Sequence, residues 1–155
     1  MLKRENVLVI GSGGREHAIA RAMRLSPSVA EVFCAPGNAG MTSVGTLVSL
    51  DVNDHAAVIR FVEEKSVALT VIGPEAPLVA GLGDALRARD HLVLGAGSQA
   101  AQLEGSKIHA KTFMAKYGLP TADFRVFDDA KEAKKFAESP EGAKFRVMKA
   151  DGLAA

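Results

Sequence analysis

Short apolar runs alternate with amphipathic segments along the first hundred residues of the chain. Four of these runs are each followed directly by glycine or proline: Val7–Ile10, Val29–Ala35, Val67–Ile72 and Leu92–Leu94. Apolar runs of this length are typical of strands that are buried on both faces of a parallel sheet. The pattern therefore predicts four parallel strands side by side, with Leu47–Leu50 as a short further strand.

Between these runs, apolar residues recur at the spacing of a helix. The predicted helices are Arg15–Leu25, a helix that is capped by Asp51 or Asn53 and has Val58 and Val62 on one face, and Leu78–Arg89. Strands that alternate with such helices form βαβ units, whose crossovers are right-handed. The sequence therefore predicts an α/β fold with a Rossmann-like, doubly wound parallel sheet and helices on both of its faces.

The alternation of strand and helix patterns stops after Gly97. The pattern predicts two successive helices, Ser98–Leu103 and Ser106–Tyr117, and then strands at Phe124–Phe127 and Phe145–Ala150 around a lysine-rich helix that starts near Asp128. We therefore predict a Rossmann-like domain over residues 1–104 and, over residues 105–155, a linker helix with the incomplete beginning of a second domain. The second part is too short for a complete domain, so we interpret the chain as a fragment.

Charge and cysteine content exclude several classes of protein. The 19 Lys and Arg residues nearly cancel the 18 Asp and Glu residues, so we expect neither a nucleic-acid partner nor a membrane partner. The single cysteine, Cys34, cannot form an internal disulfide and is expected in the core of a cytoplasmic protein. The histidines His55, His91 and His109 share no metal-ligand spacing, and we predict no metal site in this chain.

A glycine-rich segment, Gly11–His17, stands between the first predicted strand and the first predicted helix. Backbone N–H groups at such a helix N-terminus bind anions, so the segment predicts a phosphate site. The dinucleotide fingerprint would require glycine where Glu16 stands, and no acidic residue ends the second strand, which counts against NAD. A tight turn without a ligand is the alternative interpretation.

Two further loops follow predicted strands. Pro36, Gly37 and Asn38 follow one strand, and Gly73, Pro74 and Glu75 follow another. Because the carboxyl ends of parallel strands meet at one edge of a sheet, we expect both loops to converge on the glycine-rich segment. Asn38 and Glu75 would then offer polar groups to hydroxyls or to an amine.

Two lysines in the second part are candidates for phosphate contacts. Lys107 begins a predicted helix, and Lys149 ends an apolar run. The alternative for each is an ordinary solvated lysine.

Five motifs occur in order along the chain: Gly11–His17, Pro36–Gly40, Gly73–Leu78, Ala101–Lys107 and Lys149–Ala155. Together they closely resemble the phosphoribosylamine–glycine ligase family. The resemblance implies a Rossmann-like domain that precedes an ATP-grasp domain. It also implies the reaction of ATP, glycine and 5-phosphoribosylamine to ADP, phosphate and glycinamide ribonucleotide, through glycyl phosphate, in purine synthesis.

The resemblance also implies roles for individual residues. The substrate-binding residues would be Gly11, Ser12, Gly13, Gly14, Arg15, Glu16, His17, Pro36, Gly37, Asn38, Gly73, Pro74 and Glu75. The ATP-binding residues would be Lys107, Lys149, Asp151 and Gly152. The ligands of the Mg²⁺ or Mn²⁺ that accompanies ATP would lie beyond residue 155. We expect a monomer or weak dimer, and a 155-residue chain that is inactive alone.

The chain departs from the family pattern at Gly95-Ala96, where members have Gly-Pro. Two alternatives remain open. One is a binding module without catalysis, and the other is a related ATP-grasp carboxylate–amine ligase that uses another amine. The loops at Pro36–Gly40 and Gly73–Pro77 resemble the glycinamide ligase in particular and weigh against the second alternative.

Overall fold

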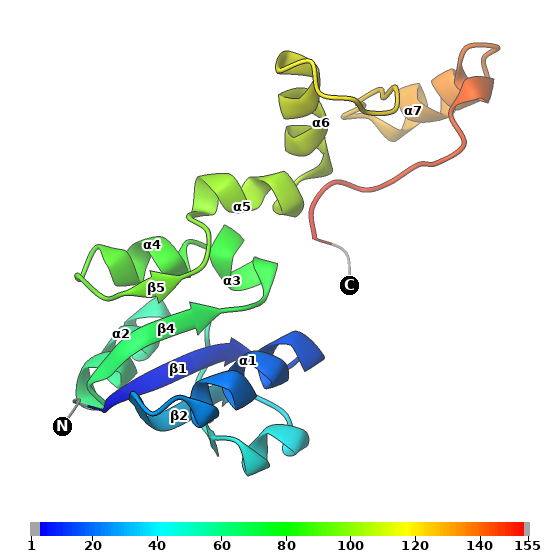
Figure 1. Cartoon of the computed structure of the whole chain (residues 1–155). Coiled ribbons are helices and arrows are strands. Elements are labelled where there is room, and N and C mark those ends of the chain that lie inside the picture. The colour runs from blue at the N-terminus through cyan, green and yellow to red at the C-terminus, as the bar shows by residue number, and fades with distance from the viewer. Residues whose placement is uncertain (1–3, 154–155) are drawn as a thin grey trace. The chain divides into compact units, whose positions relative to one another are not determined.

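The structure is a computed structural model that describes residues 4–153. It divides into two compact units between Ala101 and Gln102. The first unit contains a five-stranded parallel sheet in the order β3-β2-β1-β4-β5 (Figure 1). The strands are β1 (Glu5–Gly11), β2 (Val29–Pro36), β3 (Thr46–Leu47), β4 (Val67–Ile72) and β5 (Val93–Leu94).

The central strand β1 aligns the ends of its two neighbours. Ile10 of β1 is in register with Ala35 of β2 on one side and with Ile72 of β4 on the other. The loops that follow these strands therefore start at the same level of one sheet edge. The predicted parallel arrangement of Val7–Ile10, Val29–Ala35, Val67–Ile72 and Leu92–Leu94 is confirmed.

Helices cover both faces of the sheet, which is also as predicted (Figure 1). The helices of this unit are α1 (Gly14–Leu25), the 3₁₀ helix η1 (Ala39–Ser43), α2 (His55–Glu64), α3 (Glu75–Val79) and α4 (Leu82–Arg87), and α5 (Ser98–Gly105) crosses the boundary to the second unit. Successive residues of β1 point to opposite faces. Val9 packs in a cluster with residues of α1 and η1, and Ile10 packs in a cluster with residues of α2 and α4.

Three local predictions for the first unit are wrong. The helix expected over Leu78–Arg89 is split into α3 and α4, because Gly81 adopts a left-handed conformation with φ of 88°. Helix α2 is capped by Asp54, whose carboxylate accepts from the Ala57 amide at 2.9 Å. Neither Asp51 nor Asn53 caps it. Of the expected strand Leu47–Leu50, only Leu47 is in a strand, the two-residue β3 (Thr46–Leu47).

The second unit contains α6 (Lys107–Lys116), α7 (Ala130–Ala137) and the 3₁₀ helix η2 (Gly142–Lys144). Both α-helices start at the side chains that their sequence favours. The Ser106 hydroxyl accepts from the His109 amide at 2.9 Å, and the Asp129 carboxylate accepts from the Lys131 amide at 2.8 Å.

The strands predicted at Phe124–Phe127 and Phe145–Ala150 are not formed. An extended segment becomes a strand only when a neighbour satisfies its backbone groups, and neither segment has a strand partner among residues 4–153. The side chains of Val147 and Met148 are consequently 72% and 75% exposed. An apolar run indicated a strand correctly in the first unit and wrongly here, because the run alone does not specify its partner.

Cys34 lies fully buried in the core of the first unit, as predicted. Burial raises the pKa of its thiol. No helix within residues 4–153 is both long enough and apolar enough to cross a membrane.

The core of the first unit makes a stability prediction. Leu82 of α4 is completely buried, so Leu82→Ala should lower the free energy of unfolding by about 2–5 kcal/mol through lost burial and a cavity. Leu92 is 69% exposed, and Leu92→Ala is expected to change the free energy by about 0.5 kcal/mol or less. Urea denaturation of the two variants measures both values, and equal losses would contradict the assignment of Leu82 to the core.

Candidate functional site

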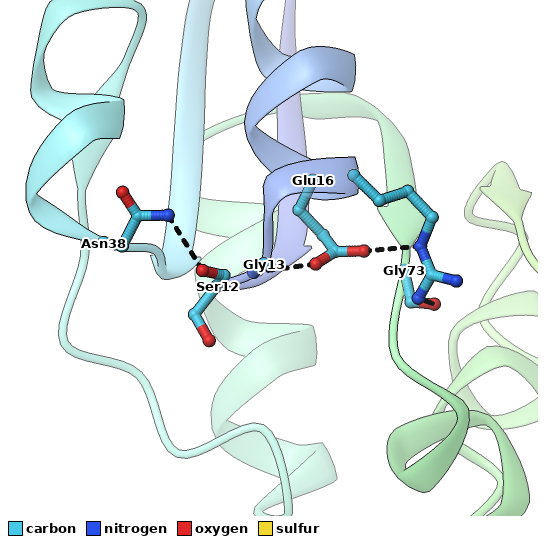
Figure 2. A network of polar contacts seen from close by, with 6 residues as sticks. Ser12, Gly13, Glu16, Asn38 and Gly73 are labelled. Carbon is cyan, nitrogen blue, oxygen red and sulfur yellow. Dashed lines mark hydrogen bonds and ion pairs between the residues drawn. The ribbon is translucent and has the colours of Figure 1, made fainter.

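Three loops converge at the carboxyl edge of the sheet (Figure 2). The Gly37 amide donates to the Gly11 carbonyl at 3.2 Å, and the Gly73 amide donates to the Ile10 carbonyl at 3.0 Å. These bonds join the loops after β2 and β4 to the loop between β1 and α1. The structure thus brings the three predicted glycine-bearing loops together.

Asn38 links two of these loops through its side chain. Its amide nitrogen donates to the Ser12 carbonyl at 2.8 Å (Figure 2). Its amide oxygen accepts from the Gly40 amide at 2.8 Å. The second bond caps η1. Asn38 therefore holds the rim of the site in shape and keeps only part of its hydrogen-bonding capacity for a ligand.

Glu16, in the first turn of α1, points into the protein and is 4% exposed. One carboxylate oxygen accepts from the Gly13 amide at 2.9 Å, and the other accepts from Arg15 Nε at 2.8 Å (Figure 2). Sequence reasoning placed Glu16 among the substrate-binding residues and missed this inward orientation. The signal was present, because a Glu three residues after a helix N-cap is half of a capping box.

Opposing effects set the pKa of Glu16. Burial would raise it, but the hydrogen bonds from Arg15 and from the Gly13 amide, with the charge of Arg15, hold the pKa below its ordinary value. The carboxylate is therefore ionised at neutral pH.

The lowered pKa of Glu16 predicts how stability depends on pH. Because the folded pKa lies below the unfolded one, the contribution of the carboxylate is complete above the unfolded pKa and disappears as pH falls through the folded pKa. Glu16→Gln should cost about 1.5–3 kcal/mol of unfolding free energy at pH 7. The difference between the two proteins should shrink as pH falls below the ordinary pKa of a glutamate carboxylate, about 4.3. Urea denaturation of the wild type and of Glu16→Gln at several pH values in this range measures the difference in unfolding free energy. A difference that does not change with pH would contradict the ionic role of Glu16.

Arg15 places a cation beside the N-terminus of α1. Its Nε donates to Glu16, and its Nη2 donates to the carbonyl oxygen of Gly73. The side chain is nevertheless 63% exposed. Arg15 thus spans from the first turn of α1 to the loop after β4 and still presents positive charge to solvent.

Two backbone donors of the glycine-rich loop remain available. Among residues 4–153, neither the Ser12 amide nor the Gly14 amide donates a hydrogen bond. Both residues are exposed, and Gly14 is the first residue of α1. Free N–H groups at a helix N-terminus, next to an arginine, form an arrangement suited to an anion.

The other predicted residues of the first unit lie around these loops. His17 is half-buried beside Gly40, where a methyl group would lie 3.2 Å from its ring. Pro36 ends β2, and Pro74 caps the start of α3. Glu75 is the first residue of α3, and no residue in the described part of the chain hydrogen-bonds its carboxylate.

In the second unit, Lys107, Asp151 and Gly152 come together at the start of α6. The Asp151 carboxylate accepts from the Ser106 hydroxyl at 2.9 Å and from the Ile108 amide at 3.1 Å. Lys107 Nζ donates to the Gly152 carbonyl. The bond from the Ile108 amide is the main cause that lowers the pKa of Asp151, and the bond from Ser106 adds to it.

Lys149 differs from Lys107 in its surroundings. It is exposed, and its ammonium group has no partner in the part of the chain that the structure describes. Within the same residues, no cluster of three or more His, Cys, Asp or Glu side chains is placed to hold a metal ion.

Comparison with family models accounts for both units. Residues 5–104 match the phosphoribosylglycinamide synthetase N domain, and residues 105–155 match the ATP-grasp (A) domain of the same family. The chain belongs to the phosphoribosylglycinamide synthetase family. The resemblance drawn from the five motifs is confirmed, as is an α/β fold that leads into the start of an ATP-grasp domain.

Individual relatives agree with the family. The phosphoribosylamine–glycine ligase of Agrobacterium fabrum is 53% identical over 149 residues, which are 96% of this chain and 35% of that protein. The crystal structure of the Thermotoga maritima ligase superposes with a TM-score of 0.69 at 34% identity, over 96% of this chain and 33% of its own. The N5-carboxyaminoimidazole ribonucleotide synthetase of Thermus thermophilus superposes with a TM-score of 0.61 at 25% identity, over 85% of this chain and 35% of its own. The chain spans about a third of the length of the curated relatives it matches.

Proposed function

We propose that the protein carrying this chain is a phosphoribosylamine–glycine ligase, which joins glycine to 5-phosphoribosylamine at the expense of ATP. The single observation that carries the proposal is the convergence of three glycine-bearing loops on the N-terminus of α1. Free amides and an arginine there suit a sugar phosphate. The identity to named ligases, 53% in the Agrobacterium fabrum protein, supports this choice of substrate.

The first unit would bind 5-phosphoribosylamine. Its phosphate would take hydrogen bonds from the Ser12 and Gly14 amides and face the charge of Arg15. Glu75, whose carboxylate has no intramolecular partner within residues 4–153, would accept hydrogen bonds from the amine or the sugar hydroxyls. The backbone of the neighbouring loops and His17 would line the remaining surface of the sugar.

The second unit would begin the ATP site. Phosphoryl transfer depends on positioning and on neutralisation of charge more than on covalent help from the protein. Lys149 has no partner among the described residues, so its ammonium group is available to the phosphates of ATP. Asp151 and Gly152 would hold the backbone near the nucleotide, because the Asp151 carboxylate accepts from Ser106 and Ile108 and the Gly152 carbonyl accepts from Lys107 at the start of α6.

The proposed reaction has two steps. The terminal phosphoryl group of ATP passes to a carboxylate oxygen of glycine, which gives ADP and glycyl phosphate. The amine nitrogen of 5-phosphoribosylamine then attacks the acyl carbon, inorganic phosphate leaves, and the nitrogen loses a proton to give glycinamide ribonucleotide. The residues of this chain bind and orient the sugar in the second step.

A divalent ion, Mg²⁺ or Mn²⁺, would accompany ATP. The residues described here do not fit such an ion, since they form no cluster of candidate ligands. We therefore assign its ligands to other parts of the full-length protein and derive no step through it from this chain. We further propose a cytoplasmic enzyme, which the free thiol of Cys34 supports, acting as a monomer or weak dimer.

The proposal is tested with the full-length protein that carries this chain. ADP release should require glycine and 5-phosphoribosylamine together, and mass spectrometry should identify glycinamide ribonucleotide. Omission of each substrate in turn provides the control. ADP release that depends on a different amine would support the related-ligase alternative, and the absence of any such release would support a binding module; either result contradicts the proposal.

A further inference from the structure

The side chain of Glu16 fills the space between two of the site loops. A methyl group added at Gly73 would lie 2.5 Å from Glu16 Cγ, one at Gly13 would lie 2.7 Å from Oε2, and one at Gly11 would lie 2.8 Å from Cδ. All three distances are shorter than any normal contact between an added carbon and a carbon or oxygen atom to which it is not bonded. The loops before α1 and after β4 can therefore pack against Glu16 only as glycines.

Gly73 is informative because its backbone does not itself require glycine. Gly11 has φ of 131°, a conformation that other residues rarely adopt. Gly73 does not belong to the positive-φ residues of the chain. The side chain of Glu16 is thus the reason that residue 73 lacks a side chain.

The carboxylate of Glu16 has little capacity left for a ligand. Its side chain is 5% exposed, and its two oxygens accept from the Gly13 amide and from Arg15. An ionised carboxylate would also repel the phosphate group of a substrate. Both facts weigh against the direct substrate contact that the motif resemblance implies for this residue.

We propose that Glu16 is a positioning residue that sets the spacing between the two loops and orients Arg15 toward the phosphate, without touching the substrate. This inference rests on the proposed function, since it concerns the same sugar-phosphate site. Arg15 is held at Nε by Glu16 and at Nη2 by the Gly73 carbonyl, so it loses less conformational freedom when an anion binds. Loss of this side chain would release Arg15 and leave the gap between the loops unfilled, whereas a glutamine oxygen at the same place still accepts from Arg15 Nε.

A double-mutant cycle of Glu16→Ala and Gly73→Ala tests this role in the full-length protein. Gly73→Ala alone should lower the thermal midpoint and raise the Kd of D-ribose 5-phosphate about tenfold, because its methyl group meets Glu16. In the Glu16→Ala background, where that group is gone, Gly73→Ala should change both quantities little. Glu64→Ala, which removes an exposed carboxylate of α2, is the matched control and should leave both unchanged.

Kinetics separate positioning from a general loss of structure. Glu16→Ala should raise the KM for 5-phosphoribosylamine about tenfold, with kcat and the KM for ATP within about twofold of wild type. Glu16→Gln has nearly the same shape and should recover most of the loss. It also replaces Glu16→Ala in the cycle if that variant does not fold, and there its larger side chain should preserve the clash with Gly73→Ala.

Equal effects of Gly73→Ala in the wild-type and Glu16→Ala backgrounds would overturn the positioning role, as would loss of the Gly73→Ala effect in the Glu16→Gln background. So would equal losses of ribose 5-phosphate affinity in Glu16→Gln and Glu16→Ala, the pattern of a carboxylate that binds the substrate directly. A wild-type protein that neither binds ribose 5-phosphate nor releases ADP would instead refute the proposed function. The thermal midpoints of the cycle would then still decide whether Glu16 spaces the loops.

Discussion

Lys149→Ala in the full-length protein is expected to lower kcat about a hundredfold, the usual effect of removing one group that stabilises charge in the transition state. Lys149 is exposed and has no partner among residues 4–153, so its ammonium group is available to neutralise phosphate charge. The KM for 5-phosphoribosylamine should stay within about twofold, because the sugar loops belong to the first unit. Steady-state kinetics with each substrate varied in turn measure these constants.

Two comparisons make the result specific. Lys131→Ala removes the same charge from an exposed position of α7 and should leave kcat unchanged. Glu75→Ala should show the reverse pattern, with the larger effect on the KM for 5-phosphoribosylamine. Unchanged turnover and an unchanged KM for ATP in Lys149→Ala would show that this lysine has no role at the ATP site.

Gly13→Val should abolish detectable binding of D-ribose 5-phosphate. Residue 13 is the N-cap of α1 and lies between the free amides of Ser12 and Gly14, where a branched side chain would block the approach of a phosphate group. Its Cβ would also lie 2.7 Å from Glu16 Oε2 and displace that carboxylate. Isothermal titration calorimetry measures the loss of binding, and circular dichroism shows whether the variant is folded.

Ala18→Val is the control for added bulk. It places the same side chain on the exposed side of the same helix and should bind ribose 5-phosphate like the wild type. A folded Gly13→Val protein with wild-type affinity would show that the sugar phosphate binds elsewhere.

The sheet could be predicted because the sequence of each long strand is itself typical of a buried strand. Val67–Ile72 is apolar except for Thr70, and a parallel strand buried on both faces requires such a predominantly apolar composition. Parallel pairing then places the residues that follow β1, β2 and β4 at one edge, which predicts the convergence of the three loops. The apolar runs and the parallel pairing of the strands were together sufficient to predict that the three loops meet.

The interior of the site could not be predicted in the same way. Glu16 packs against Gly73, which lies 57 residues further along the chain. Arg15 likewise donates to the Gly73 carbonyl. Such contacts depend on side-chain orientation after the loops have met, and local pattern carries no information about it. Only the half capping box of Gly13 and Glu16 indicated that the carboxylate turns back toward its own helix.

The second unit shows the limit of the apolar pattern. Phe145–Ala150 has the composition of a strand, yet no strand pairs with it within the described residues. Helices α6 and α7 form as predicted because a helix satisfies its backbone internally and is started by local caps such as Ser106 and Asp129. Local interactions are therefore predictable here, whereas pairing between distant segments is not.

The measurement that tests the central claim most directly is an NMR titration of the ¹⁵N-labelled 155-residue chain with D-ribose 5-phosphate. The claim is that the glycine-rich loop at the N-terminus of α1 binds the phosphate of the sugar. The amide signals of Ser12, Gly14 and Arg15 should shift in a saturable manner, and those of exposed residues on α7 should not. Shifts confined to other parts of the chain, with none at the Gly11–Arg15 loop, would contradict the claim.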